Sequence, residues 1–298
     1  MEISLLLLTI LLMLLINIFR NAFGQRGLQN KSDALMFNIL ISLFSLVVVL
    51  IFGKGFNLPS VYTQLLGILF GIATGLGMLF TTWAMACGPM SYTILIVSCA
   101  MLLPTFSGAL FWNEPISLSQ YAGVVLLILS LFCGMNPKHD KRITFKWALN
   151  SAGAFLCSGL VGVMQKIHQS SVHKDELSPF LFIAFAVSAL FMFGLCCYYR
   201  LKEGLRITIF RRENRGRVWL LSLGIGICTG ATNCLNLYLS GVLPSVLFFP
   251  VTNGSVIVLS ALAAKLFFNE KMERNQIVGV VSGALGVALC GNITELLR

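Results

Sequence analysis

Long apolar segments alternate with short polar ones along the whole chain. Residues 3–19 and 121–135 are runs without a charged side chain and without regular alternation of apolar and polar positions. A hydrocarbon core of about 30 Å needs about 20 apolar residues per helix, and backbone groups in lipid must be satisfied internally. The pattern therefore predicts membrane-spanning helices rather than barrel strands. Ten are expected, at residues 3–22, 34–52, 62–86, 89–112, 117–136, 147–168, 178–199, 218–240, 243–268 and 274–292.

The composition agrees with a membrane protein and excludes an ordinary soluble domain. Hydrophobic residues make up 57% of the chain and charged residues 11%, with a mean hydropathy of +0.88. A soluble domain carries about 25% charged residues. No Lys or Arg precedes the first apolar run, which begins after Glu2, so we interpret this run as a span and not as a removable signal. The predicted fold class is all-α integral membrane.

Basic residues concentrate on one side of the predicted bundle. The net charge is +10, and Lys and Arg cluster at residues 19–31, 138–146 and 200–217, which ten spans place on the same side. Such an excess marks the cytoplasmic side, so both termini are expected outside a bacterial plasma membrane. Topology and attraction to anionic lipids explain the basic loops, and no nucleic-acid partner is expected. Four of the 21 basic residues fall on the other side: Lys54, Lys166, Lys174 and Arg298.

The two halves of the chain resemble each other. The segment NEPISLSQYAGVV at 113–125 aligns with NEKMERNQIVGVV at 269–281. One span earlier, GIATG at 71–75 aligns with GICTG at 226–230. Matches in the same order across successive spans indicate a tandem duplication.

Each repeat contains five predicted spans, with residues 1–137 in the first repeat and 147–298 in the second. Because five is odd, the second repeat enters the membrane from the opposite face. The expected fold is therefore ten transmembrane helices in two inverted five-helix repeats. Inverted repeats usually mark transporters that hold their substrate near the membrane midplane and work by alternating access.

The sequence resembles the drug/metabolite transporter superfamily, specifically its EamA-like ten-helix members. The resemblance rests on a span that ends in an acidic residue, followed by a Gln and a Gly in the next span. These residues, with the proline that leads the first span, are Pro104, Glu114, Gln120 and Gly123 in one repeat and Glu270, Gln276 and Gly279 in the other. The resemblance covers essentially the whole chain and implies transport of small metabolites, with export as the expected direction.

An Asn-Glu pair stands between the fourth and fifth spans of each repeat. A helix start exposes unpaired N–H groups, which favour an Asn cap and a nearby carboxylate. We therefore expect Asn113 and Glu114, like Asn269 and Glu270, to form a structural turn at the membrane interface, with Pro115 in the first helical position. A role for these carboxylates in coupling transport to an ion is the alternative.

The substrate site is expected near the midplane, between the third, fourth, eighth and ninth spans, with contributions from the first and sixth. Pro104 and Pro250 each remove a backbone hydrogen bond within a span and are expected to interrupt it. The candidate substrate-binding residues are Trp83, Ser98, Asn233, Asn236, Tyr238, Thr252 and Asn253. Because no fixed charge lies deep in this set, a zwitterion or a neutral amphiphile is the expected substrate. The amides could instead serve only to join neighbouring helices.

Enzymatic chemistry is not expected. The three histidines form no metal motif, no nucleophile–histidine–acid set can be identified, and we expect neither a cofactor nor a metal ion. The expected partners are a small-molecule substrate and the lipid bilayer. Two alternatives stay open, a flippase for a lipid-linked group and a membrane assembly partner that does not transport.

Overall fold

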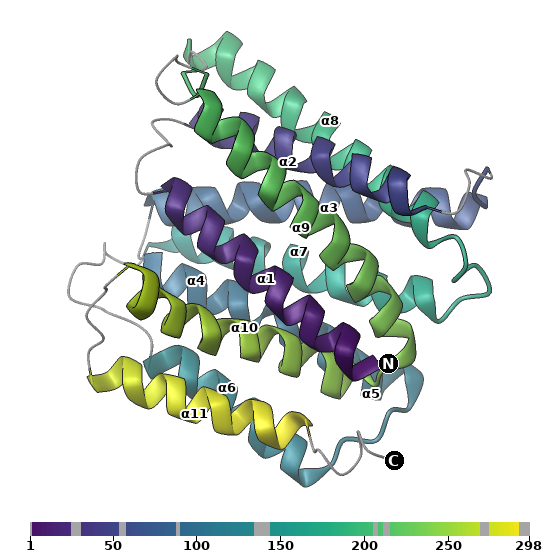
Figure 1. Ribbon diagram of the computed structural model, residues 1–298, viewed down its shortest axis with the longest axis vertical. Helices are drawn as coiled ribbons and strands as arrows, with labels where there is room; N and C mark the ends of the chain where they lie inside the picture. The colour runs from purple at the N-terminus through teal and green to yellow at the C-terminus, as the bar shows by residue number, and fades with distance from the viewer. Residues whose placement is uncertain are drawn as a thin grey trace. The chain divides into compact units, whose positions relative to one another are not determined.

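The regular elements in the described part of the chain are all helical. The computed structural model describes residues 2–24, 31–53, 58–87, 90–133, 144–204, 208–210, 215–268 and 274–291. The helices (Figure 1) are α1 (Glu2–Gly24), α2 (Lys31–Phe52), α3 (Val61–Cys87), α4 (Met90–Ser98), the 3₁₀ turn η1 (Cys99–Met101), α5 (Leu102–Trp112), α6 (Leu118–Cys133), α7 (Phe145–Gln169), α8 (Leu177–Glu203), α9 (Arg215–Val242), α10 (Ser245–Phe268) and α11 (Arg274–Gly291). The predicted all-α membrane class is confirmed.

The ten predicted spans correspond to these helices, with one span divided among α4, η1 and α5. Eight described segments are long and apolar enough to cross a bilayer, while α6 and α11 contribute shorter apolar segments. The 16 residues of α6 extend about 24 Å at 1.5 Å per residue. Length and hydropathy together make this an integral membrane protein.

The turn between α5 and α6 differs from the prediction for Asn113. This residue follows α5 in the left-handed conformation, with φ of 51°, and the N–H of Glu114 donates to the Gly108 carbonyl over 3.2 Å. Helix α6 instead has a capping box, in which the Ser117 N–H donates to Gln120 Oε1 over 2.9 Å and the Gln120 N–H to Ser117 Oγ over 3.3 Å. The interpretation of Asn113 as the cap of α6 is wrong, because Ser117 takes that position.

The two prolines have different surroundings. The 3₁₀ turn η1 divides α4 from α5 shortly before Pro104, which has no N–H to donate. Helix α10 runs continuously through Pro250, so the interruption expected there is wrong. Side chains after this proline bond to carbonyl groups of the preceding turn, Thr252 Oγ1 to Phe248 O over 2.6 Å and Asn253 Nδ2 to Phe249 O over 2.9 Å. Such side-chain bonds help a membrane helix to tolerate proline.

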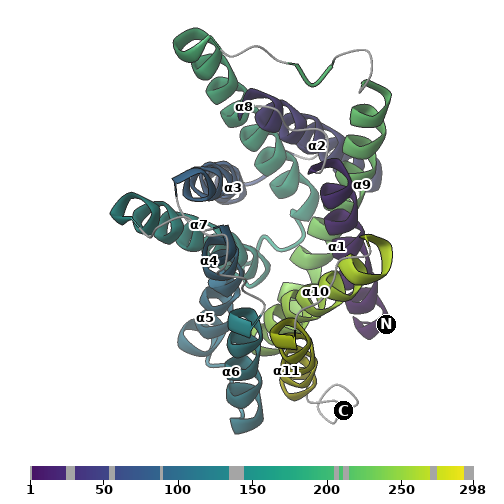
Figure 2. The same cartoon turned by 90° about the vertical axis from the view of Figure 1, so that its left-hand side faces the viewer.

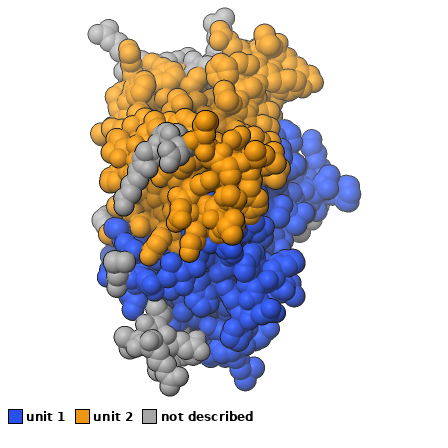
Figure 3. All heavy atoms as spheres, turned by 90° about the vertical axis from the view of Figure 1, so that its right-hand side faces the viewer, with its two compact units in different colours: residues 1–10, 76–170, 239–298 blue, residues 11–75, 171–238 orange. Residues whose placement is uncertain are grey.

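The chain forms two compact units, coloured separately in Figure 3. Unit 1 contains residues 1–10, 76–170 and 239–298, and unit 2 contains residues 11–75 and 171–238. Each unit therefore combines segments from both halves of the chain. The predicted repeats describe internal similarity of the sequence, whereas the compact units follow tertiary packing.

In unit 2, glycines allow two helix pairs to pack closely. A Cβ atom at Gly71 of α3 would lie 2.6 Å from the Ala184 carbonyl of α8, and one at Gly230 of α9 would lie 2.8 Å from Val48 Cβ of α2. Ser45 Oγ of α2 also donates to the Gly226 carbonyl of α9 over 2.9 Å. The aligned GIATG and GICTG segments thus both serve as close helix–helix contacts, as small residues at four-residue spacing commonly do.

In unit 1, α6 and α11 lie side by side in both ribbon views (Figures 1 and 2). Their backbones meet at two glycines, because a Cβ atom at Gly123 would lie 2.7 Å from the Gly286 carbonyl and one at Gly286 would lie 2.8 Å from the Gly123 carbonyl. Ser130 Oγ of α6 donates to the Gly279 carbonyl of α11 over 2.6 Å. Helix α10 packs against α5 and α11, and α7 packs against α4 and α5.

Candidate functional site

Helix α9 has an apolar outer face and a polar buried face in unit 2. Ile227 and Tyr238 are exposed and lie three helical turns apart, on the same side of the helix. Thr229, Thr232 and Asn236 follow a spacing of three and four residues, which places them together on the opposite side. We call these three residues the α9 polar stripe.

The α9 polar stripe holds hydrogen-bonding capacity that the described part of the chain does not use. Thr229 Oγ1, Thr232 Oγ1 and Asn236 Oδ1 are buried and have no hydrogen-bond partner among the described residues. Threonines in other helices donate to the carbonyl four residues earlier, over 2.6–2.8 Å: Thr9, Thr74, Thr105 and Thr252. A buried polar group without a partner costs about 1–3 kcal/mol, so the stripe is suited to a ligand or water that satisfies it.

Of the three predicted site residues in unit 2, only Asn236 belongs to the stripe. Asn233 Nδ2 donates to the Thr229 carbonyl of its own helix over 2.9 Å. Tyr238 is 36% exposed and lies on the same side of α9 as Ile227, away from Asn236, so its assignment to a shared site stays a prediction. Two residues along a helix correspond to roughly 200° of rotation, which separates the two side chains.

The other predicted site residues belong to unit 1. Trp83 contacts Phe80 edge-on at a centroid distance of 6.0 Å, and Ser98 ends α4 immediately before η1. Thr252 and Asn253 bond to carbonyl groups of their own helix, α10, as described above. These side chains therefore lie on three different helices, α3, α4 and α10.

A buried ion pair is the strongest electrostatic feature of unit 1. Glu114 Oε1, after the end of α5, lies 2.6 Å from Lys166 Nζ of α7, with the side chains 14% and 6% exposed. Glu114 Oε2 accepts the N–H of Ser245 over 2.7 Å, and Lys166 Nζ also lies 3.5 Å from the Leu243 carbonyl. Glu114 therefore caps α10 from a distance instead of capping α6.

The surroundings of this pair favour both charges. The first residue of α10 has an N–H that no intrahelical carbonyl accepts, and a helix start carries partial positive charge. Lys166 lies in the last turn of α7, where the helix end carries partial negative charge. A Cβ atom at Gly108 would collide with Glu114 Oε2, so glycine is required for the carboxylate to reach this position.

Lys166 was missed as a functional candidate, although the sequence contains a signal for it. It is the only Lys, Arg, Asp or Glu in the predicted span 147–168. A charged residue within a span pairs with another charge or with a carbonyl, and Lys166 does both. The other Asn-Glu pair, Asn269 and Glu270, lies outside the described residues.

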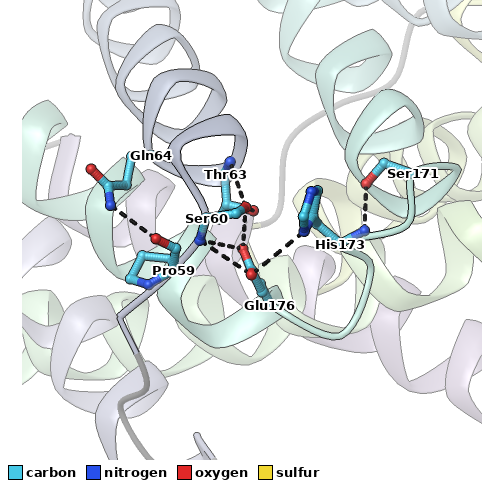
Figure 4. A network of polar contacts seen from close by, with 7 residues as sticks. All are labelled: Pro59, Ser60, Thr63, Gln64, Ser171, His173 and Glu176. Atoms are coloured by element: carbon cyan, nitrogen blue, oxygen red, sulfur yellow. Dashed lines mark hydrogen bonds and ion pairs between the residues drawn. The ribbon is translucent and has the colours of Figure 1, made fainter.

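A second carboxylate, Glu176, caps a helix in unit 2 (Figure 4). It accepts the Ser60 N–H over 3.0 Å and the Ser60 hydroxyl over 2.7 Å at the start of α3. His173 Nδ1 lies 3.6 Å from its Oε1, and the His173 ring stacks on Tyr62. Burial raises the pKa of Glu176, but hydrogen bonds from Thr63 and Ser60 and the charge of His173 outweigh this effect, so the pKa lies below its ordinary value.

These polar groups are suited to binding rather than to bond-making chemistry. Within the described residues, no three His, Cys, Asp or Glu side chains gather where they could hold a metal ion. The α9 polar stripe offers two hydroxyl groups and an amide oxygen. The ion pair offers one carboxylate and one ammonium group.

Comparison with known proteins finds a family match in the second half of the chain. Residues 145–291 match the EamA-like transporter family, which confirms the expected resemblance there. An uncharacterised protein of Haemophilus influenzae is 25% identical over 191 residues, and the match spans 61% of this chain and 60% of that relative's length. A solved crystal structure shares the fold, with a TM-score of 0.72 at 16% identity and coverage of 99% of both chains. The matched family is described as one of transporters.

Proposed function

We propose that this integral membrane protein moves a small metabolite or drug-like amphiphile across the membrane by alternating access. The family match over residues 145–291 supports membrane transport. The proposed direction is export from a bacterial cell, with both termini outside, because the basic loops are expected in the cytoplasm. The proposed partners are the bilayer and the solute, and transport needs no cofactor.

The observation that carries this proposal is the α9 polar stripe. A helix in lipid gains nothing from burying hydroxyl and amide oxygens that bond to no other group. Thr229, Thr232 and Asn236 nevertheless lie opposite the exposed apolar face of α9. A solute with N–H or O–H donors would satisfy these oxygens while it is bound. Since a carrier must also release its cargo, a few hydrogen bonds of modest strength suit this role.

The chemistry of the stripe indicates the class of solute. It contains no charged side chain, so the bound part of the solute is neutral or carries an ammonium group that oxygens can accept. Trp83, Ser98, Thr252 and Asn253 in unit 1 stay predicted substrate-binding residues from the sequence, and the proposal does not depend on them. The sequence left open that the amides only join neighbouring helices. This role is less suited to Asn233 and Asn253, because their Nδ2 groups donate to carbonyl groups of their own helices.

A ligand screen with matched variants tests the stripe. Detergent-purified protein is melted with a panel of metabolites, since a ligand that binds the native state raises its melting temperature. Thr232→Val removes an unpartnered hydroxyl while keeping the shape, and Thr105→Val removes a hydroxyl that bonds to the Met101 carbonyl. A lost hydrogen bond of about 0.5–1.5 kcal/mol predicts up to about tenfold weaker binding for Thr232→Val alone. Equal affinity in both variants would contradict a site on the stripe.

A further inference from the structure

Glu114 occupies a place in unit 1 that has the composition of a carboxylate-binding site. Its two oxygens contact the ammonium group of Lys166 at 2.6 Å and the Ser245 N–H at 2.7 Å. Helix starts with a nearby cation bind free carboxylates and phosphates by the same combination of N–H groups and positive charge. Helix α10 is 24 residues long, so its start carries the full helix-end dipole.

This place contains one more hydrogen-bond donor than Glu114 uses. Ser245 is fully buried, and its Oγ has no partner among the described residues. The hydroxyl lies beside the carboxylate, since a Cβ atom at Gly108 would touch Glu114 Oε2 and lie 2.9 Å from Ser245 Oγ. A carboxylate placed slightly differently could accept both the N–H and the hydroxyl of Ser245. Glu114 therefore leaves one donor of this site, the Ser245 hydroxyl, without an acceptor.

We propose that the site is exchangeable, so that the carboxylate of an organic anion takes the place of Glu114 between Lys166 and the start of α10. Only the identification of that anion with the transported solute rests on the function proposed above. The exchange replaces one negative charge by another, and Lys166 is never left alone. Removal of a buried charge without replacement would instead leave its partner uncompensated, which is strongly destabilising.

Glu114 is placed so that it can leave. It lies in the non-helical segment 113–117 between α5 and α6, whose neighbouring residues Asn113 and Pro115 are exposed. Because these neighbours are exposed, a carboxylate released from this segment need not cross the buried interior of unit 1. Its departure also removes the hydrogen bond by which the segment after α5 accepts the Ser245 N–H at the start of α10, although the two helices still pack against each other. Arrival of the anion would therefore loosen this junction, as a transporter needs when one side opens.

Chemical rescue tests whether the site accepts a free carboxylate. Glu114→Ala removes a group of the size of acetate, and the variant is melted with increasing acetate at constant ionic strength. We expect a saturable rise in melting temperature of several degrees with acetate and none with acetamide. The same titration of the Glu114→Ala/Lys166→Met double variant should show no rise. Glu176→Ala is the matched control, because its more exposed site is open to water and should not respond.

A second variant covers the case in which Glu114→Ala does not fold. Glu114→Gln keeps the volume of the side chain but competes less well for Lys166, so acetate should bind this variant at least tenfold more tightly than the wild-type protein. The proposal is overturned if acetate fails to stabilise the folded Glu114 variant, or stabilises it equally after Lys166→Met. These experiments measure acetate binding in detergent and not transport. A negative result would therefore overturn the exchangeable site without contradicting transport, and an absence of transport would not contradict acetate binding.

Discussion

Two carboxylates in this protein cap the start of a distant helix, but only one of them is paired with a buried charge. Glu114 accepts the Ser245 N–H of α10, and Glu176 accepts the Ser60 N–H of α3. The cation beside Glu114 is Lys166, 6% exposed, whereas the side chain beside Glu176 is His173, 37% exposed. Removing a partner of Glu114 should therefore cost more stability than removing a partner of Glu176, because water can replace the lost partner only at the more exposed Glu176.

The surroundings of the two carboxylates suggest different roles. Glu176 joins the start of α3 to the segment before α8 (Figure 4). Glu114 joins α5, α7 and α10 inside unit 1. A mutation at Glu176 tests the strength of one helix cap, whereas a mutation at Glu114 tests the balance of charge within the bundle.

The largest difference is expected when the ion pair is broken. Lys166→Met and Glu114→Gln each leave one buried charge without its partner and should each lower the free energy of unfolding by about 3–5 kcal/mol. The double variant should lose much less than the sum, because no lone charge remains. Reversible unfolding in mixed micelles measures all four proteins. Small and additive losses would show that water already reaches this pair.

An intermediate effect is expected when the carboxylate is displaced without removing its charge. In Gly108→Ala the added methyl group would collide with Glu114 Oε2 and lie 2.6 Å from Ser245 Cβ. Overpacking of this kind costs about 1–3 kcal/mol. Gly194→Ala in α8 is the control, because no atom lies within 4 Å of its added Cβ, and it should raise stability by about 0.5–1 kcal/mol. Equal behaviour of the two variants in thermal melts would argue against a tightly held Glu114.

The smallest effect is expected at Glu176. Glu176→Gln should lower stability by about 0.3–1 kcal/mol, since the amide keeps an acceptor but loses the charge–dipole interaction. The folded-state pKa of Glu176 is depressed, so its contribution is present above the unfolded pKa of about 4.3 and is lost as the pH falls through the folded value. Melting curves of wild type and variant should therefore differ at neutral pH and converge in acid. A difference that grows on acidification would contradict this sign.

The apolar pattern was sufficient to predict the spans but not the faces of the helices. Each predicted segment overlaps at least one described helix, because bilayer thickness sets the length of an apolar run. A helix that is apolar on most sides gives no clear signal for its outer face, so Tyr238 was grouped with Asn236. Exposure of Ile227 and Tyr238 in the structure identifies the outer face of α9.

Tertiary pairing explains what else was missed. Glu114 and Lys166 lie 2.6 Å apart but belong to different predicted repeats, and no local pattern joins them. Asn113 and Glu114 are adjacent to a helix start in sequence, which favoured a local cap. The capping box at Ser117 and Gln120 was the better local signal, since a Ser followed three residues later by Gln satisfies two N–H groups reciprocally.

Exchange in reconstituted vesicles tests most directly whether this protein carries a solute across the membrane. Vesicles are loaded with the ligand that gives the largest thermal shift, and entry of labelled ligand from outside is followed at equal protein content. We expect saturable exchange by the wild type, about tenfold or more weaker apparent affinity for Asn236→Leu, and no change for Tyr238→Leu on the outer face. Ligand binding without any exchange would contradict transport and favour a role in membrane assembly.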